Sequence, residues 1–280
     1  MIIAIFTHAG KNHSKPIAIG IREFLTKNDV KVVVEDSQAS LLSAEPLSSV
    51  KPEEVDFIIS LGGDGTILRI VHAHPELNAP IIGINLGGLG FMADIPIEEI
   101  YPCLDNILKG NFTIQNRIMM EGECQGQDNC FAINEMVIHR SHNPSLIDFA
   151  VYVDGNYLNT FSADGLIIAT PNGSTAYSLA AGGPILTPEL QAFILTPISP
   201  HTLSNRPIVL MPKQQLEVRY LGEYEKVEVT YDGFANFFIR TGEVFRVTQS
   251  ERSFRLVTLP GYDYFATLRT KLGWSGKLKK

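Results

Sequence analysis

The sequence has few cysteines, no long apolar run and little positive charge. Its three cysteines, Cys103, Cys124 and Cys130, are odd in number and form no C-x-x-C pair. This pattern argues against a disulfide framework and against a zinc site. No apolar stretch is long enough to span a bilayer, and the first residues lack the basic start and apolar segment of a signal peptide. We therefore expect a cytoplasmic protein with no membrane partner.

Acidic residues outnumber basic ones, 30 to 23, and the formal net charge is −7. Proteins that bind nucleic acids or anionic membranes in a general way present a basic surface, so we expect no nucleic-acid partner. The basic C-terminal stretch 277–280 is more typical of a short solvated tail. The hydrophobic content of 45% is that of a soluble globular protein, and 280 residues are enough for two domains.

Short apolar runs alternate with amphipathic segments in the first part of the chain. Such alternation indicates βαβ crossovers and a parallel sheet. We predict an α/β N-terminal domain with a Rossmann-like parallel sheet over residues 1–110. The expected strands are 2–7, 30–35, 55–61 and 80–85, and the expected helices are 15–28, 66–74 and 97–108.

From residue 111 onward most segments are typical of strands, and turn residues such as Asp154 and Gly155 separate them. This spacing predicts an all-β sandwich C-terminal domain over residues 111–259. We expect the last segment, 260–280, to pack back on the first domain through a helix at 262–272. A cleft between domains is a favoured place for a small-molecule site. The expected strands are 112–124, 131–140, 147–154, 157–161, 166–170, 207–211, 215–221, 226–231, 237–240, 244–248 and 253–259.

A glycine-rich turn follows the strand expected at 55–61. The stretch LGGDGTILR places Gly62, Gly63 and Gly65 around a single acid, Asp64. In an open α/β sheet, ligands bind beyond the carboxyl ends of the strands. Glycines there allow positive φ and close approach of a ligand, and the N–H groups of such a turn, with a helix start behind them, form an anion site. We predict a phosphate loop that would fit a triphosphate.

Asp64 is unexpected beside a phosphate, because two negative charges repel each other. It would hold a Mg²⁺ that neutralises the phosphates, or it would accept a hydrogen bond from the hydroxyl of a second substrate and aim that oxygen at phosphorus. Alternatively, it only caps the following helix. The spacing leaves these roles open, because the loop is neither a Walker pattern nor G-x-G-x-x-G.

A second candidate site lies in the stretch TPNGSTAYSLAAGGPIL, residues 170–186. It predicts a turn and a short helix of small residues, along which a ligand would lie close to the backbone. Tyr177 would stack on a flat base or donate through its hydroxyl. The alternative is a tightly packed joint between helix and strand, with Tyr177 in the core.

Two polar pairs, Asn134-Glu135 and Asp164-Gly165, complete the candidate residues. The first pair interrupts a strand, and neighbours in a strand point to opposite faces, so both side chains would alternatively face solvent. The second pair is alternatively a simple turn. His72 and His74 are more typical of surface groups than of a metal site, and we see no dedicated carboxylate cluster for a metal.

Taken together and in this order, GGDGT (62–66), Asn134-Glu135, Asp164-Gly165 and GSTAYSLAAGGPI (173–185) resemble the NAD kinases of the bacterial type. GGDG alone is weak evidence for this family, because diacylglycerol kinases, sphingosine kinases and phosphofructokinases carry a similar turn. Its combination with GSTAYSLAAGGPI is specific for NAD kinases. The resemblance runs through nearly the whole chain, since it includes GINLGGLGFMADI (83–95), PHTLSNRPIVL (200–210) and TKLGWSGKL (270–278).

The resemblance implies an activity and an architecture. NAD kinases transfer the γ-phosphate of ATP, or of polyphosphate in some members, to the 2′-hydroxyl of the adenosine ribose of NAD, which gives NADP. Mg²⁺ enters with ATP, and the family is usually homodimeric or homotetrameric. Its fold is an α/β domain followed by a β-sandwich, with the last helix on the first domain.

The resemblance also implies roles for the candidate residues. Asp64 would bond the ribose hydroxyl as the general base, Gly65 would contact the same nucleotide, and Arg69 would meet phosphate charge unless it lies on a solvated helix face. Asn134 and Glu135 would bind the adenine and ribose of NAD, and Asp164 would bind the nicotinamide end. The wall on the adenine side would comprise Thr175, Ala176, Tyr177, Ser178, Leu179 and Ala180, with Tyr177 against the base.

Three positions depart from common family residues. Ser162 stands where Arg is frequent, Phe234 follows Asp232-Gly233 where Gln is frequent, and Met92 follows Phe91 where some relatives have an aromatic. These departures would affect affinity or the preference between NAD and NADH. Two rival functions remain: a lipid kinase that shares the glycine turn, and a dinucleotide sensor that has lost catalysis.

Overall fold

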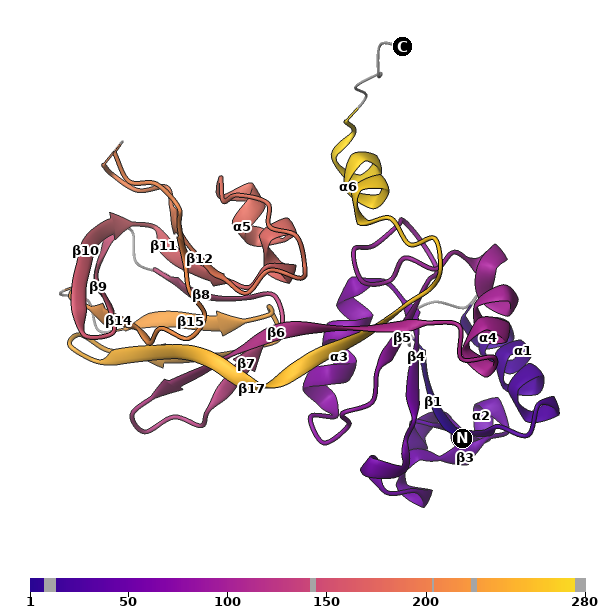
Figure 1. The fold of residues 1–280 in the computed structure, drawn as a ribbon. Coiled ribbons are helices and arrows are strands. Elements are labelled where there is room, and N and C mark those ends of the chain that lie inside the picture. Colours follow the sequence, from indigo (N-terminus) through magenta and orange to yellow (C-terminus); the bar gives the residue numbers. More distant parts are fainter. Residues whose placement is uncertain (8–13, 142–144, 203, 223–225, 275–280) are drawn as a thin grey trace, which may run out of the picture. The chain divides into compact units, whose positions relative to one another are not determined.

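A computed structural model describes residues 1–7, 14–141, 145–202, 204–222 and 226–274 (Figure 1). The basic stretch 277–280 lies outside these ranges. The chain divides into two compact units, which we call unit 1 (Met1–Gln115 with Arg255–Lys280) and unit 2 (Asn116–Phe254). Each unit is described by itself. In the described part of the chain, no helix combines the length and apolar character needed to cross a bilayer.

Unit 1 is built on the predicted parallel sheet, with strand order β3-β2-β1-β4-β5. β1 and β4 are apolar almost throughout because both faces of a parallel sheet are covered. The end of β17 extends this sheet, where Leu256 pairs in parallel with Ile81. The strands are β1 (Ile2–Thr7), β2 (Lys31–Val34), β3 (Glu45–Pro46), β4 (Phe57–Gly62) and β5 (Ile81–Asn85).

The helices of unit 1 follow their apolar spacing. α1 buries Ala18, Ile21 and Leu25, which share one helical face. α6 begins at a side-chain cap, because Asp263 accepts hydrogen bonds from the N–H groups of Phe265 and Ala266. The helices are α1 (Ser14–Lys27), α2 (Ala39–Leu42), α3 (Asp64–Ala73), α4 (Ile100–Leu108) and α6 (Tyr264–Leu272).

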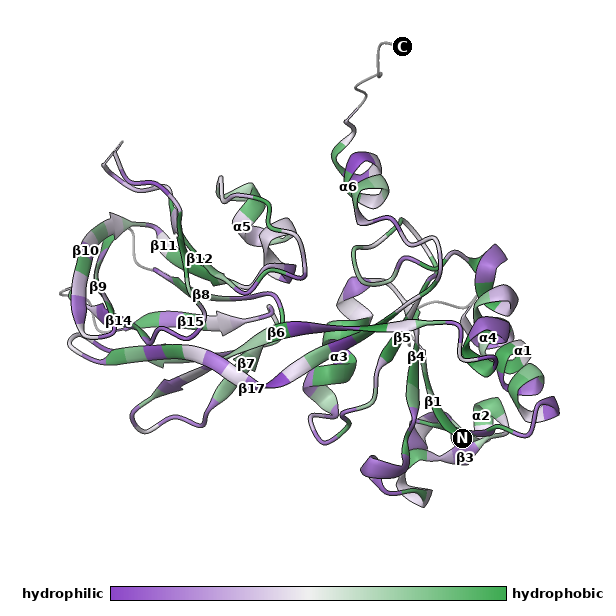
Figure 2. Ribbon diagram, viewed as in Figure 1, coloured by the Kyte–Doolittle hydropathy of each residue, from purple (hydrophilic) through white to green (hydrophobic). Residues whose placement is uncertain are grey.

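Unit 2 is the predicted sandwich of antiparallel strands. One sheet has the order β10-β9-β14-β17 and includes β6 and β7, and the other has the order β13-β12-β11-β8-β15-β16. Phe149 and Phe245 of the first sheet share one apolar core with Met136 and Ile168 of the second, and β11 and β12 are among the strands that Figure 2 colours as hydrophobic. The strands are β6 (Thr113–Cys124), β7 (Cys130–Ala132), β8 (Glu135–His139), β9 (Ile147–Val153), β10 (Asn156–Ala163), β11 (Gly165–Ala169), β12 (Phe193–Ile198), β13 (Ile208–Leu210), β14 (Leu216–Tyr220), β15 (Val227–Tyr231), β16 (Ala235–Ile239) and β17 (Val244–Thr258).

The predicted strands differ from the structure at residues 131–140, at 244–259 and at β12. The strands expected at 244–248 and 253–259 are one strand, β17, because the polar stretch between them stays in the sheet: Ser250 donates a hydrogen bond to Glu121. The strand expected at 131–140 is two strands, since β7 pairs with β6 whereas β8 pairs with β11 and β15. β12 was not among the predicted strands; it contains Pro197, a residue that rarely occupies a central strand.

Candidate active site

The predicted phosphate loop lies where β4 ends and α3 begins, at the carboxyl end of the parallel strands. Gly63 is the cap residue of α3: its N–H donates to Thr66 Oγ1 at 3.4 Å, and its carbonyl accepts the N–H of Thr66 at 2.9 Å. Asp64 and Gly65 form the first turn of the helix. The N–H groups of these two residues have no acceptor within the helix, so they are available to an anion, whereas the N–H of Thr66 is already bonded to Gly63.

The expectation that the loop glycines use positive φ was wrong. Gly63 has φ −124°, and neither Gly62 nor Gly65 is among the glycines with positive φ. Gly62 is instead required by close packing, because a Cβ there would lie 2.1 Å from Thr66 Oγ1. A Cβ on Gly63 or Gly65 would meet no protein atom within 4 Å. The absence of side chains at these two positions therefore leaves open space at the start of α3.

The Asp64 carboxylate accepts three consecutive backbone N–H groups from a second glycine-rich turn, residues 86–93, which follows β5. Phe91 donates to Oδ2 at 2.8 Å, and Met92 and Ala93 donate to Oδ1 at 3.0 and 2.8 Å. The reading in which Asp64 only caps its own helix is therefore wrong, because Gly63 holds that position and the carboxylate points to another loop.

This contact explains how an acid can lie in a phosphate loop. Three N–H dipoles point at the carboxylate and offset part of its repulsion for a nearby anion. Each carboxylate oxygen has two lone pairs, so Oδ1 is saturated by its two donors while Oδ2 keeps one acceptor position. Gly90 is needed for this approach, since a Cβ there would lie 2.1 Å from Asp64 Oδ1.

Asn85 stabilises the same turn from inside. Its Nδ2 donates to the carbonyls of Gly88 and Ala93 at 2.7 and 2.9 Å, and its Oδ1 accepts the N–H of Gly87 at 2.6 Å. In the sequence, this turn stood out only as part of the motif GINLGGLGFMADI (83–95). The sequence feature that could have revealed its structure is Asn85, at the end of β5 and just before the glycines, because asparagine often bonds to the backbone of a turn.

Arg69 lies one helical turn beyond Gly65 and is partly buried. Its guanidinium donates to the carbonyl of Thr7, at the end of β1, at 3.0 Å. This contact keeps the positive charge at the carboxyl edge of the sheet. A phosphate contact of Arg69 stays a prediction.

In unit 2, Asn134 and Glu135 lie where the chain leaves one sheet and enters the other. The carboxylate of Asp232 accepts the N–H groups of Ile133, Asn134 and Glu135 at 2.8, 2.7 and 3.2 Å. Asp232 and Gly233 both have positive φ, 49° and 71°, so they form the tight turn that aims this carboxylate. Asp232 therefore fixes the backbone of both predicted ligand-binding residues.

Glu135 is a largely buried acid with incomplete hydrogen bonding. Its carboxyl group accepts the N–H of Tyr177, but Oε2 is buried and has no hydrogen-bond partner within the described residues. Burial and, secondarily, the negative charge of Asp232 raise the pKa of Glu135 to about 8. A ligand hydroxyl would supply the missing partner.

Glu135, Asp164 and Tyr177 line one cavity of about 390 Å³. Tyr177 is 46% exposed, which excludes the alternative that placed its ring in the core. The Asp164 carboxylate forms an ion pair with Arg140 Nε at 3.2 Å. Arg140 thus brings a positive charge into this cavity.

The predicted wall at 175–180 forms a 3₁₀ turn, η5 (Asn172–Thr175), followed by α5 (Tyr177–Ala180). Thr175 Oγ1 donates to the carbonyl of Asn172 at 3.2 Å. Ser178 is fully buried, and its hydroxyl bonds to that of Thr196 at 3.0 Å. The side chain of Ser178 is therefore not accessible to a ligand in this structure. Ala176 and Leu179 are partly exposed, and Ala180 is exposed.

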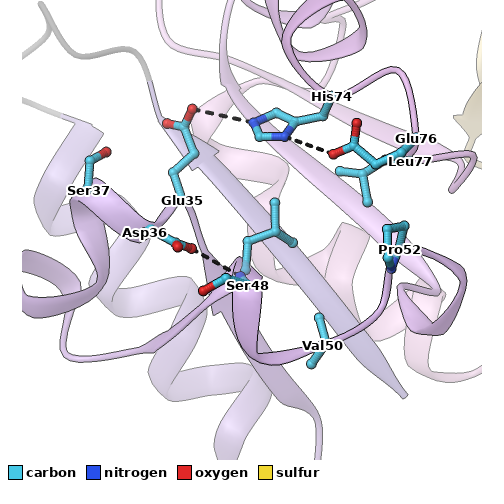
Figure 3. A pocket seen from close by; sticks show the side chains of 10 residues that line it. Glu35, Asp36, Ser37, Ser48, Val50, Pro52, His74, Glu76 and Leu77 are labelled. Atoms are coloured by element: carbon cyan, nitrogen blue, oxygen red, sulfur yellow. Dashed lines mark hydrogen bonds and ion pairs between the residues drawn. The ribbon is translucent and has the colours of Figure 1, made fainter.

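Unit 1 contains another cavity, of about 520 Å³, which none of the predicted site residues line (Figure 3). His74 lies between two acids there, with Nδ1 3.3 Å from Glu76 and Nε2 3.8 Å from Glu35. His74 is half-buried here, because its ring packs against Phe6 and its side chain is 22% exposed. Among the described residues, no three His, Cys, Asp or Glu side chains are grouped to hold a metal ion.

Two family models match the chain: the ATP-NAD kinase N-terminal domain over residues 3–112, and the ATP-NAD kinase C-terminal domain over residues 133–259. The NAD kinase of Protochlamydia amoebophila (strain UWE25) is 57% identical over 278 residues, which cover 99% of this chain and 100% of the relative. The NAD kinase of Geotalea daltonii is 38% identical over 281 residues, with 97% and 98% coverage.

Two solved structures are similar to this chain. The yeast NADH kinase, crystallised with NADH, superposes with a TM-score of 0.87 at 24% identity, covering 100% of this chain and 89% of that one, which shows a shared fold. An NAD kinase from Archaeoglobus fulgidus, crystallised with ATP, has a TM-score of 0.77 at 30% identity, with 99% and 100% coverage.

Proposed function

Because the chain belongs to the ATP-NAD kinase family, we propose that it transfers the terminal phosphoryl group of MgATP to the 2′-hydroxyl of the adenosine ribose of NAD, which gives NADP and ADP. The observation that carries the proposal is the Asp64 carboxylate, which is held by three N–H groups and keeps one acceptor position on Oδ2. That position suits a single hydroxyl donor.

In the proposed mechanism Asp64 Oδ2 accepts the hydrogen bond of the ribose hydroxyl and orients its oxygen. The oxygen–phosphorus bond forms as the bond to the leaving ADP breaks, and the hydroxyl proton passes to Asp64. Phosphoryl transfer depends mainly on positioning and on neutralising charge. Mg²⁺ supplies part of that neutralisation, held chiefly by the phosphates with which it enters.

The start of α3 is the proposed phosphate site. Two observations support it: the open space over Gly63 and Gly65, and the N–H groups of the first helical turn. Arg69 would add a positive charge at the same edge. Inorganic polyphosphate presents the same chemistry to this site as the end of ATP, so it is the second donor to test.

The cavity of unit 2 is the proposed dinucleotide site. Tyr177 would stack on the adenine, as its exposed ring allows. Asn134 and Glu135 would bind the adenine and ribose, and the unpartnered Glu135 Oε2 supports a hydroxyl ligand there. Asp164 would bind the nicotinamide end.

We also infer a cytoplasmic homodimer or homotetramer. The location is supported by the three cysteines, which are all free and buried. Assembly is inferred from the family alone, and light scattering of the purified protein measures it.

The test is an incubation of the purified protein with NAD, ATP and Mg²⁺, followed by a measurement of NADP. NADP formation is expected. If diacylglycerol is phosphorylated instead, the protein is a lipid kinase, and if NAD binds without turnover it is a sensor.

Replacing the proposed base tests the mechanism. Asp64→Asn should lower kcat by about 10²- to 10⁴-fold, the usual effect of a positioned base, while NAD binding persists. Asp36→Asn is the matched control, because Asp36 also accepts a backbone N–H, that of Ser48 at 3.0 Å, outside the phosphate loop. Near-normal turnover by Asp64→Asn, in a protein with an unchanged melting temperature, would remove Asp64 from this role.

A further inference from the structure

Three buried side chains of unit 2 form a hydrogen-bonded chain that ends at Asn134. Arg117, on β6, donates from Nη1 to Asn172 Oδ1, and Asn172 donates from Nδ2 to Asn134 Oδ1 at 2.6 Å. Their exposed fractions are 2%, 8% and 9%. They come from three segments that lie far apart in the sequence: β6, η5 and the connection between β7 and β8.

The first member of this chain determines the orientation of the other two. A guanidinium has only donors, whereas a carboxamide has an acceptor on one side and a donor on the other. The atom of Asn172 that faces Arg117 must therefore be its oxygen. Asn172 is then left with its NH₂ group toward Asn134, so the atom of Asn134 that faces it must also be an oxygen. An isolated asparagine would have no such constraint.

The consequence is that Asn134 presents its Nδ2 group away from the chain of amides. No described residue accepts a hydrogen bond from this group. The backbone of Asn134 is fixed on both sides, because its N–H donates to Asp232 at 2.7 Å and its carbonyl accepts the N–H of Thr170 at 2.8 Å. Gly173 completes the constraint, since a Cβ there would lie 2.1 Å from the carbonyl oxygen of Asn134.

We propose that Arg117, acting through Asn172, is a positioning residue that makes Asn134 a pure hydrogen-bond donor toward the bound dinucleotide. This inference rests on the proposed function, because it takes Asn134 as a ligand of NAD. The chemical group recognised is then a hydrogen-bond acceptor, such as a ring nitrogen or a sugar oxygen. Arg117 touches neither substrate and acts on NAD affinity alone.

Asn172→Asp is the decisive variant, because it reverses the direction of the hydrogen bond between residues 172 and 134 without removing that bond. Both oxygens of the introduced carboxylate are acceptors, so one would pair with Arg117 and the other would require a donor from Asn134. The Asn134 amide would then rotate and present its oxygen to NAD. We expect the Kd and KM for NAD to rise roughly 10- to 100-fold, because the oxygen of Asn134 would then face a hydrogen-bond acceptor on NAD and both groups would lose their partner. The kcat at saturating NAD and the KM for ATP should change by less than about twofold.

Two substitutions of Arg117 separate orientation from packing. Lys is also a pure donor, so Arg117→Lys should keep the NAD affinity within a fewfold of the parent. Gln can present either an oxygen or an NH₂ group, so Arg117→Gln should weaken NAD binding. Binding is measured by calorimetry with NAD in the full-length protein, and melting temperatures show whether each variant is folded.

The outcomes distinguish this inference from the proposed function. If the parent protein neither binds nor phosphorylates NAD, the proposed function fails and this inference fails with it. If the parent is active while folded Asn172→Asp binds NAD with unchanged Kd, only the inference is overturned. Equal NAD affinities of folded Arg117→Lys and Arg117→Gln would overturn it as well.

Discussion

Two aspartates, Asp64 in unit 1 and Asp232 in unit 2, make the same kind of contact. Each carboxylate accepts three consecutive backbone N–H groups from a segment distant in the sequence. Such charge-assisted bonds are stronger than bonds between neutral groups. They fix the loops that carry the candidate site residues, so these aspartates act on the geometry of the site as well as on its charge.

The candidate residues themselves could be predicted from the sequence, but these contacts could not. Asp64 was singled out because an acid among glycines is unusual, and Asp232 was noted only for its departure at Phe234. The partners of Asp64 lie 27 to 29 residues away, and those of Asp232 lie 97 to 99 residues away. Local propensity does not report contacts over such separations, because they depend on how the strands pair.

Glu135 makes the stability of the protein depend on pH. Its pKa in the folded protein is about 8, raised from a usual 4.5 first by burial and then by the charge of Asp232. The folded state thus holds this proton more tightly than the unfolded chain does. The contribution of Glu135 to stability is therefore fully present below the pKa of the unfolded chain, 4.5. It is lost as the pH rises through the pKa of the folded protein, about 8.

Glu135→Gln should remove this dependence, because the amide stays neutral. We expect the free energy of unfolding of the variant, relative to that of the parent, to be higher at about pH 9 than at about pH 5. Urea unfolding at both pH values measures this difference. Glu23→Gln, at an exposed position on α1, is the control and should show no such gain. A constant difference between Glu135→Gln and the parent would show that Glu135 does not titrate in this range.

At the scale of elements, the period of apolar residues predicted most of the strands and helices. β1 was predicted with the bounds that the structure has, Ile2–Thr7. The failures have local causes. β12 contains Pro197, and the break between β7 and β8 depends on Asp232, which no residue near 131–140 reveals. Patterning reports which face of an element is buried, but not the point at which a strand changes sheets.

α3 gives a prediction in which stability and activity change in opposite directions. Gly65 lies in the first turn of this helix, and a Cβ there would meet no protein atom within 4 Å. Gly65→Ala should therefore raise stability, by up to about 1 kcal/mol, because alanine favours the helix. If a substrate lies in that space, the added methyl group should raise the KM for NAD or ATP roughly tenfold or more.

Thr26→Ala is the matched control for Gly65→Ala, because Thr26 is exposed on α1 and the substitution also favours a helix. It should raise stability slightly with unchanged kinetics. Thermal unfolding and steady-state kinetics on both variants give the comparison. Unchanged KM values in Gly65→Ala would mean that no substrate lies over the start of α3.

At the scale of the whole molecule, unit 1 is assembled from two distant parts of the chain. The C-terminal part supplies Leu256 and Val257 from β17 and Leu268 from α6, all of which are buried. Thr258 is hydrogen-bonded to Thr113 through their hydroxyls at 2.6 Å. The core of unit 1 is therefore incomplete until the end of the chain has been made.

Residues 1–115 alone should consequently fail to fold cooperatively. Each buried aliphatic side chain contributes about 1.5–3 kcal/mol, so the loss of three of them is comparable to the total stability of a domain, about 5–15 kcal/mol. A second polypeptide, in which a short Gly/Ser linker joins residue 115 to residues 255–274, should fold, because the contact between Thr113 and Thr258 brings the two ends together. Urea unfolding followed by circular dichroism compares the two. A cooperative transition for residues 1–115 alone would show that this part of the chain forms a complete core and that the C-terminal segment only packs on its outside.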